Sequence, residues 1–278
     1  MEQKTRAPGV SAGLGRVIRP WMSVIVLLAA WQIADVLDVL NPNVLPGPIA
    51  IFQSAWELTA TGALGSALLA SLPRVVIGLS LGILIGVGFG LLAAFSRVGA
   101  DLIDRPVQMI RAIPFTAWVP LFILWFGIGE MPKVMLVFVG TAIPLYINTY
   151  AGVRNVDTKL IEVGRVYRHG PVNIAVNILL PGALPTILAG LRQSTAIAWI
   201  ALIVAETVAT NQGIGFLLSN ARQFSQTDVV IVCILLYAAL GLLTDWLVRL
   251  VEDRMLGWRK PSMWRSVQRP DSHRKERT

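Results

Sequence analysis

The chain has 278 residues, of which 55% are hydrophobic and only 14% are charged, and its mean hydropathy is +0.65. Soluble domains carry roughly 25% charged residues, so this composition excludes an ordinary soluble domain and places most of the chain in a membrane. The net charge of +8 lies in loops and tails between apolar runs, which favours attraction to lipid headgroups over binding of nucleic acid.

The chain begins with a polar, basic segment, predicted as a cytoplasmic tail over residues 1–19, and an apolar run follows over 21–39. A cleaved signal peptide is one interpretation of this run, with residues 27–30 as its apolar core. The run continues past that core to Val36, which favours a retained spanning helix.

No lysine or arginine occurs from the first apolar run as far as Arg74, so this stretch is predicted to lie outside the cytoplasm. Residues 49–58 within it are typical of an amphipathic helix at the membrane interface. The second span is predicted over 73–95 and carries four glycines at four-residue spacing. Glycine is common in spanning helices, but such a row also lets two helix backbones approach closely. We therefore expect a packing face made of Gly78, Gly82, Gly86 and Gly90.

The third span contains two prolines, Pro114 and Pro120, and is predicted to be kinked or broken. Lysine and arginine gather at the two ends of the chain and in the second and fourth loops. This distribution predicts six helices with both termini in the cytoplasm. The expected fold is an all-α integral membrane domain over 20–258, followed by a basic cytoplasmic tail over 259–278. Its later spans are predicted at 107–126, 132–150, 184–208 and 229–251.

The loop over 153–181 is basic but contains apolar residues at three- and four-residue steps, as in a short amphipathic helix. Gly170 and Pro171 then end that helix. One interpretation is an ordinary amphipathic cytoplasmic loop. The other is a contact site for a partner protein, formed by Leu160, Ile161, Val163, Val166 and Tyr167.

The fifth predicted span has one charged and aromatic stripe, because Arg192, Trp199 and Glu206 are seven residues apart, with Thr195 beside them. The two charges are roughly 21 Å apart along the helix. Charges within a membrane usually face protein or water, so we predict that the stripe lines a translocation path. The alternative is that Arg192 reaches the cytoplasmic surface while Glu206 pairs at a helix junction.

Residues that could perform chemistry are few. The sequence contains no phosphate-binding Gly-x-x-x-x-Gly-Lys motif and no nucleophile or metalloprotease motif. Two histidines and one cysteine, far apart in sequence, do not suggest a metal site. No lysine or arginine is predicted near the centre of a span, so a fixed cationic site for an anion deep in the membrane is not expected. Any ATP that drives transport must bind another chain.

The loop resembles the E-A-A-x-x-x-G-x9-I-x-L-P segment of permease subunits in bacterial binding-protein-dependent ATP-binding-cassette (ABC) importers. Glu162 takes the Glu position, and Ile178, Leu180 and Pro181 take the closing positions. Three positions depart from the pattern: Val163 and Gly164 replace the alanines, and Arg168 replaces the glycine, with Gly170 two residues later. The resemblance implies that the loop couples to an ATPase through Glu162, Val163, Gly164, Tyr167, Arg168, Gly170 and Pro181.

Further segments look like the aliphatic sulfonate, taurine and nitrate branch of these permeases, and the resemblance covers roughly residues 20–258. They include RAIPFTAWVPLFILWFG from Arg111 to Gly127, and Val204-Ala-Glu-Thr207, which adds Thr207 to the predicted path. The resemblance implies the type I importer permease fold, a homodimer in the inner membrane, two cytoplasmic ATPase subunits and an extracytoplasmic substrate-binding protein. It implies no cofactor for this chain. Residues 217–230 are most similar to the aliphatic sulfonate member.

Two other classes of function are open on the sequence. A secondary transporter or channel would also have six spans, but it should place coupling ionisable groups deep in the membrane, and few are found. A membrane-embedded enzyme would need a nucleophile or a metal cluster. Within the importer interpretation, taurine, nitrate or another small organic anion is the alternative to an aliphatic sulfonate.

Overall fold

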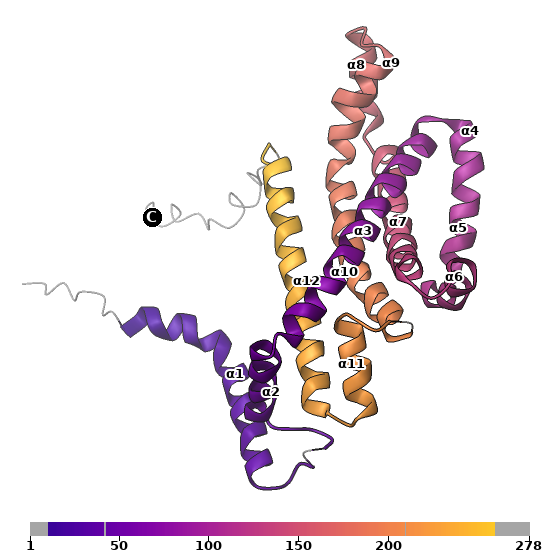
Figure 1. The fold of residues 1–278 in the computed structure, drawn as a ribbon. Coiled ribbons are helices and arrows are strands. Elements are labelled where there is room, and N and C mark those ends of the chain that lie inside the picture. The colour runs from indigo at the N-terminus through magenta and orange to yellow at the C-terminus, as the bar shows by residue number, and fades with distance from the viewer. Residues whose placement is uncertain (1–10, 42, 209, 259–278) are drawn as a thin grey trace, which may run out of the picture. The chain divides into compact units, whose positions relative to one another are not determined.

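The computed structural model describes residues 11–41, 43–208 and 210–258, and within them the regular elements are all helices (Figure 1). The prediction of an all-α fold is confirmed. The helices divide into two compact units. One comprises Met1–Ala70 and Asn211–Leu236, and the other comprises Ser71–Thr210 and Tyr237–Thr278. The predicted tail over 259–278 lies outside the described residues, as does the first half of the tail predicted over 1–19.

The first unit contains α1 (Ser11–Val36), α2 (Pro48–Ala60) and α11 (Ile214–Gln223), with the beginnings of α3 and α12. Pro48 stands at the start of α2, where the missing N–H would have no helical partner. Side chains hold this unit together: Gln32 accepts from the Ile49 N–H at 3.1 Å, and Ser54 bonds to Asp228. The helix predicted over 49–58 is present, and the connection between the last two predicted spans contains the short helix α11.

Helix α3 runs over Ala63–Phe95 and begins ten residues before the predicted start. The prediction failed at Pro73, because a proline is a common first residue of a helix but here lies inside one. Arg74 therefore belongs to the interior of α3 rather than to its edge.

The third predicted span is broken, as its prolines predicted. Its first part comprises α4 (Arg97–Gly99), the π-helix η1 (Ala100–Asp104) and α5 (Arg105–Ala112). Its second part comprises the short η2 (Phe115–Ala117) and α6 (Trp118–Phe126), and the two parts meet at an angle of 83°. The break is at Pro114, which pushes Ile113 into an extended conformation (φ −84°, ψ 123°).

The centre of the second unit is the packing of α7 (Glu130–Arg154) against α10 (Leu180–Val208). Small residues allow this contact: a Cβ atom at Gly140 would lie 3.5 Å from the Ala201 Cβ, and one at Gly152 would lie 3.4 Å from the Ala183 Cβ. Apolar side chains are buried around this contact, with Leu145, Ala198 and Leu202 at most 1% exposed.

The glycine row of α3 lies against α7. An added Cβ would lie 2.7 Å from Val137 at Gly78, 2.6 Å from the Ala142 carbonyl oxygen at Gly86 and 2.7 Å from Thr149 at Gly90. Gly82 faces Thr141 in the same way. The two backbones are therefore so close that a methyl group does not fit between them.

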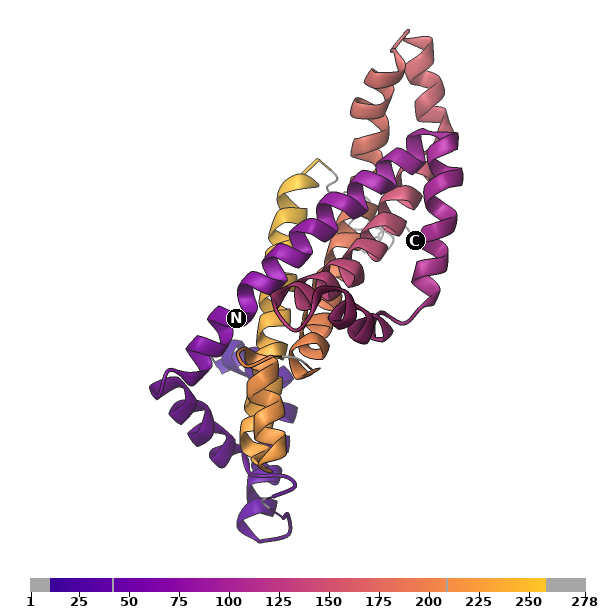
Figure 2. The same cartoon turned by 45° about the vertical axis from the view of Figure 1, so that its right-hand side comes forward.

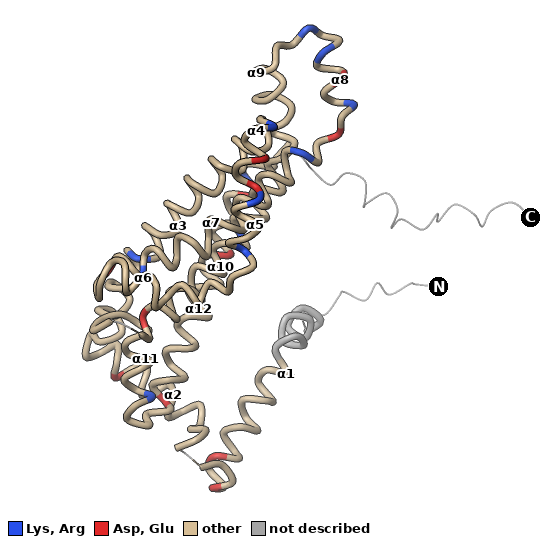
Figure 3. Tube along the Cα trace, turned by 90° about the vertical axis from the view of Figure 1, so that its right-hand side faces the viewer, with Lys and Arg blue, Asp and Glu red and all other residues tan. Residues whose placement is uncertain are grey.

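A helical hairpin stands at one end of the second unit (Figure 2). It comprises α8 (Thr158–Val166), α9 (Pro171–Ile174) and the π-helix η3 (Ala175–Leu179), which continues into α10. Lysine and arginine positions, blue in Figure 3, occur along this hairpin.

Four of the described helices are long and apolar enough to cross a membrane, and the bent third span makes five. These are α3, α7, the continuous helix Pro171–Val208 and α12 (Thr227–Met255). In the part of α1 whose side chains the structure describes, Met22–Val36 is an apolar helix shorter than a full span. Length and hydropathy thus support a multi-pass membrane protein but reproduce five of the six predicted spans.

Candidate functional site

The hairpin presents an apolar surface that no described residue of its own unit covers. Asp157 caps α8 by accepting a hydrogen bond from the Lys159 N–H at 2.9 Å, and Glu162 is exposed one turn later. Val166 is 81% and Tyr167 74% exposed, and Leu160 and Val163 are about half exposed. An amphipathic helix that leaves its apolar residues in solvent is suited to bind another protein.

The turn after α8 is made by Arg168. This residue has φ 57°, in the left-handed region, and it stands where the resembled pattern has glycine. The Arg168 N–H donates to the Arg165 carbonyl at 2.9 Å, and the His169 N–H donates to the Gly164 carbonyl at 3.0 Å. This is the Schellman arrangement that usually takes glycine at its left-handed position. Gly170 has φ −66° and is the N-cap of α9, so it does not supply the left-handed turn for which the resembled pattern has glycine.

Gly164 brings the two arms of the hairpin together. It is buried, and an added Cβ would lie 2.7 Å from the Ile178 Cδ1 in η3. Val163, its neighbour, points outward instead. Pro181 is the second residue of α10 and is half-buried. The two departures from the alanine pair therefore differ in consequence: one removes a side chain at a tight contact, and the other adds one to the exposed surface.

The first part of the predicted stripe lies along a cavity between α10 and α12. Arg192 Nε donates to the Asp245 Oδ1 at 2.5 Å, and Trp199 Nε1 donates to the Thr244 hydroxyl at 3.2 Å. Thr195 is buried and donates to the Arg192 carbonyl at 2.8 Å. The cavity has a volume of about 450 Å³ and is mostly apolar. Thr207 is half-buried and bonds to the Val204 carbonyl of its own helix at 3.0 Å.

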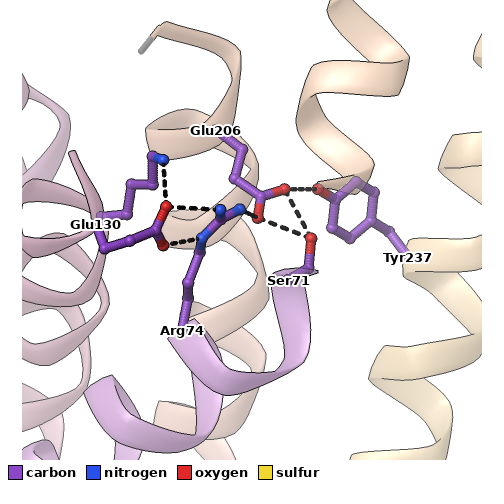
Figure 4. Close-up of polar contacts among 6 residues, drawn as sticks. Ser71, Arg74, Glu130, Glu206 and Tyr237 are labelled. Atoms are coloured by element: carbon purple, nitrogen blue, oxygen red, sulfur yellow. Dashed lines mark hydrogen bonds and ion pairs between the residues drawn. The ribbon is translucent and has the colours of Figure 1, made fainter. Parts of the chain in front are cut away.

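Glu206 does not line that cavity but lies in a buried cluster of charges (Figure 4). It is 1% exposed and accepts from Arg74 Nη1 at 2.5 Å and from the Ser71 hydroxyl at 2.7 and 2.9 Å. The Tyr237 hydroxyl donates to it at 3.4 Å. The carboxylate thus joins α10 to α3 and α12.

Arg74 connects Glu206 to Glu130 at the start of α7. Its Nε donates to Glu130 Oε2 at 2.5 Å and its Nη2 donates to Glu130 Oε1 at 2.8 Å, which makes a bidentate pair. Lys133 Nζ donates to Glu130 Oε1 at 3.0 Å. Two cations and two carboxylates balance to zero net charge. We name Ser71, Arg74, Glu130, Lys133, Glu206 and Tyr237 the charge cluster.

Sequence reasoning found only Glu206 of this cluster. Arg74 was assigned to the edge of the second span, Glu130 to the turn before the fourth span, and Lys133 to the start of the span predicted over 132–150. The i,i+3 spacing of Glu130 and Lys133 at a helix start was the one local signal available. The alternative interpretation, that Glu206 pairs at a helix junction, describes its surroundings.

The fold of a solved structure and a matching family profile together identify the class of protein. A chain of an amino acid ABC transporter solved with histidines matches with a TM-score of 0.60 and 17% identity, covering 71% of this chain and 96% of that one. The fold is therefore that of a membrane chain of an ABC transporter. The chain belongs to the family described as binding-protein-dependent transport system inner membrane component, whose profile matches residues 86–257.

Two relatives match over nearly their whole length. The putative aliphatic sulfonates transport permease protein SsuC of Escherichia coli is 42% identical over 241 residues, covering 87% of this chain and 92% of that protein. The protein of the same name from Bacillus subtilis is 42% identical over 260 residues, covering 92% of this chain and 94% of that protein.

Proposed function

We propose that this chain is the permease subunit of an ABC importer that carries aliphatic sulfonates across the inner membrane of a bacterium. The observation that carries the proposal is the 42% identity to two sulfonate permeases over most of each chain. The working complex contains two copies of this chain, two cytoplasmic ATPase subunits and an extracytoplasmic binding protein. Both termini lie in the cytoplasm, together with the hairpin.

The hairpin supplies the contact with the ATPase. Its exposed apolar residues, with Glu162 beside them, fit a groove on a partner subunit. Since η3 continues directly into α10, a displacement of the hairpin moves the end of a spanning helix. The predicted coupling residues Glu162, Val163, Tyr167 and Arg168 are all exposed on this hairpin.

The charge cluster holds the outer end of the membrane domain closed. Glu130 follows a turn that the distribution of lysine and arginine assigns to the outer side, and Glu206 lies near the end of α10. Helices joined through one buried set of ion pairs separate only when those pairs break. The predicted stripe of Arg192, Thr195, Trp199, Glu206 and Thr207 is proposed to line the path, with Glu206 and Thr207 at the level of this closure and the other three residues below it.

Uptake into proteoliposomes tests the function. The chain is reconstituted with its ATPase subunits and binding protein, and uptake of radiolabelled ethanesulfonate is followed with and without ATP. We expect ATP-dependent uptake that excess taurine and nitrate inhibit less than unlabelled ethanesulfonate. Stronger inhibition by taurine or nitrate would reassign the substrate, and uptake driven by an ion gradient without ATP would contradict the importer.

A charge reversal in the hairpin tests the coupling. Glu162→Lys should abolish uptake while membrane insertion and assembly persist. Asp253→Lys, the same reversal at an exposed position of α12, is the matched control and should transport normally. Normal uptake by Glu162→Lys would contradict the assignment of the hairpin.

A further inference from the structure

The break in the third span borders a second cavity, on the side of α10 away from the stripe. It has a volume of about 300 Å³, at the lower end of the range for small-molecule sites. Its walls are the break itself at Arg111–Phe115, the middle of α7 around Pro144, and Gln193 and Ile197 of α10. We name it the break cavity.

The break cavity differs in charge from the cavity between α10 and α12, which we name the stripe cavity. Among the described residues that line it, Arg111 alone is charged, and no carboxylate faces it. Arg111 Nη1 makes one long hydrogen bond, to Gln108 Oε1 at 3.5 Å, and a guanidinium has five N–H donors. In the stripe cavity, by contrast, Arg192 is paired with Asp245 at 2.5 Å. The break cavity therefore attracts anions and the stripe cavity does not.

Two amides lie opposite this cation. Asn148 Nδ2 donates to the Pro144 carbonyl at 2.9 Å and to the Gln193 Oε1 at 3.4 Å, which connects α7 to α10 at the cavity wall. A Cβ added at Gly190 would lie 2.5 Å from the Asn148 Cβ, so the Asn148 side chain is held in place by the helix behind it. Gln193 lines the same wall, and the hydrogen bond with Asn148 uses its amide oxygen rather than its amide N–H groups. Guanidinium and amide N–H groups are suited to the three oxygens of a sulfonate.

The rest of the wall is apolar. Ile113 and Phe115 come from the break, Ile143 and Ile147 from α7, and Ile197 from α10. A cavity with a cation at one side and isoleucines around it matches a short alkyl chain that ends in an anionic group. Irregular backbone at membrane depth is tolerated where it lines a polar cavity or is buried in protein, and transporters build substrate sites at such breaks.

We infer that the break cavity binds the substrate sulfonate during its passage, with Arg111 pairing to the sulfonate oxygens and the isoleucines contacting the alkyl chain. The inference rests on the proposed function and adds a substrate site within the permease itself. It replaces the expectation that the membrane domain offers an anion no fixed cation. Gln193 and Ile197 lie roughly 100–140° around α10 from Arg192, so this site uses another face of the helix than the predicted stripe.

Cysteine labelling tests the inference directly on the purified, assembled complex. A reporter cysteine is introduced by Ile197→Cys, and independently by Ile147→Cys, with Cys233→Ser removing the native thiol. Each is labelled with 2-sulfonatoethyl methanethiosulfonate and with its trimethylammonioethyl counterpart, and each rate is divided by the rate with 2-mercaptoethanol in solution. These reagents are similar in size and opposite in charge, and the first carries the sulfonate group itself.

We expect the sulfonate reagent to be favoured by about tenfold, which corresponds to about 1.4 kcal/mol. Arg111→Gln should remove this preference. Arg105→Gln, the same change on an exposed face of α5 outside the cavity, should leave it unchanged. A preference that is absent at both reporters, or that persists in Arg111→Gln, would overturn the inference.

Protection separates a sulfonate site from a general anion site. Ethanesulfonate should slow labelling at equal ionic strength, while nitrate and sulfate, which lack an alkyl chain, should do so at least tenfold more weakly. Equal protection by all three anions would overturn the assignment to a sulfonate. Uptake measured with the same complex distinguishes the two proposals. Sulfonate uptake without a labelling preference would refute the substrate site alone. A labelling preference without sulfonate uptake would refute the proposed function alone.

Discussion

Removing one charge from the charge cluster should strongly destabilise the membrane domain. Glu206→Gln keeps the shape of the side chain but leaves the cluster with a net charge of +1, because Glu130 is then the one carboxylate of the charge cluster against the two cations Arg74 and Lys133. At the 2.5 Å separation of Arg74 and Glu206, two unit charges attract by about 6–7 kcal/mol at an effective dielectric constant of about 20. The glutamine oxygen retains part of the hydrogen bonding, so we expect a loss of about 3–5 kcal/mol, the usual cost of breaking a buried pair.

Thermal melting of the purified complex in detergent measures this loss. For a domain of this size, 1 kcal/mol shifts the melting temperature by about 2–4 °C, so Glu206→Gln should lower it by about 6–20 °C. Glu57→Gln is the matched control, since Glu57 is exposed on α2, and it should melt like the native protein. The scan rate is kept fixed because melting of membrane proteins is often irreversible.

The double variant decides whether charge balance is the cause. Arg74→Gln alone leaves a net charge of −1, whereas Arg74→Gln with Glu206→Gln leaves Glu130 and Lys133 balanced. The double variant should therefore be more stable than the sum of the two single losses predicts, by about 1–3 kcal/mol. Strict additivity, or a native melting temperature for Glu206→Gln, would refute the reasoning.

Three further predictions concern other parts of the chain. Gly86→Ala should destabilise by about 1–3 kcal/mol in the same melting assay, because its Cβ would lie 2.6 Å from a carbonyl oxygen of α7. Gly88→Ala, on the same helix with no atom within 4 Å of its Cβ, should cost nothing. Arg168→Gly should keep ATP-driven uptake and raise the melting temperature slightly, since a left-handed conformation costs a non-glycine residue about 1–2 kcal/mol, whereas Arg168→Val should lower both. Thr195→Cys and Trp199→Cys, each with Cys233→Ser, test whether the stripe lines the pore. Labelling by water-soluble thiol reagents that differs between ATP-bound and nucleotide-free complexes would support pore lining, and uniform protection would place the stripe in a packed interface.

Features set by short-range pattern were predictable from the sequence. The apolar steps over 160–167 indicated α8, and Pro114 indicated the break in the third span. Both follow from constraints that act within one turn of a helix, namely side-chain period and the missing proline N–H. The glycine spacing indicated a tight contact for α3, but the spacing carries no information on which helix supplies the partner.

Features set by long-range contacts were not predictable in the same way. The partners of Arg74 lie 56 and 132 residues away in the chain, so no local pattern could join them. Pro73 also misplaced Arg74, because the proline indicated the start of the span and therefore put Arg74 at its edge. A spanning helix tolerates an internal proline when neighbouring groups satisfy the freed carbonyl. Arg168 shows a limit of another kind: the pattern required glycine, but two backbone hydrogen bonds of the turn hold an arginine there instead.

The proposed coupling and the proposed closure meet on one helix. Pro171–Val208 is continuous, so Glu206 stands 35 residues, or about 53 Å, from Pro171 in the hairpin that would contact the ATPase. A continuous helix transmits a displacement without a separate chain of side-chain contacts, unless it bends on the way. The π-helix Ala175–Leu179 and the internal Pro185 are the weak points of this helix, and both lie near its hairpin end. Beyond Pro185 the hydrogen-bonded helix passes the break cavity at Gln193 and then reaches the charge cluster. A movement transmitted through the first four turns or so therefore acts on the proposed substrate site and on the proposed closure together.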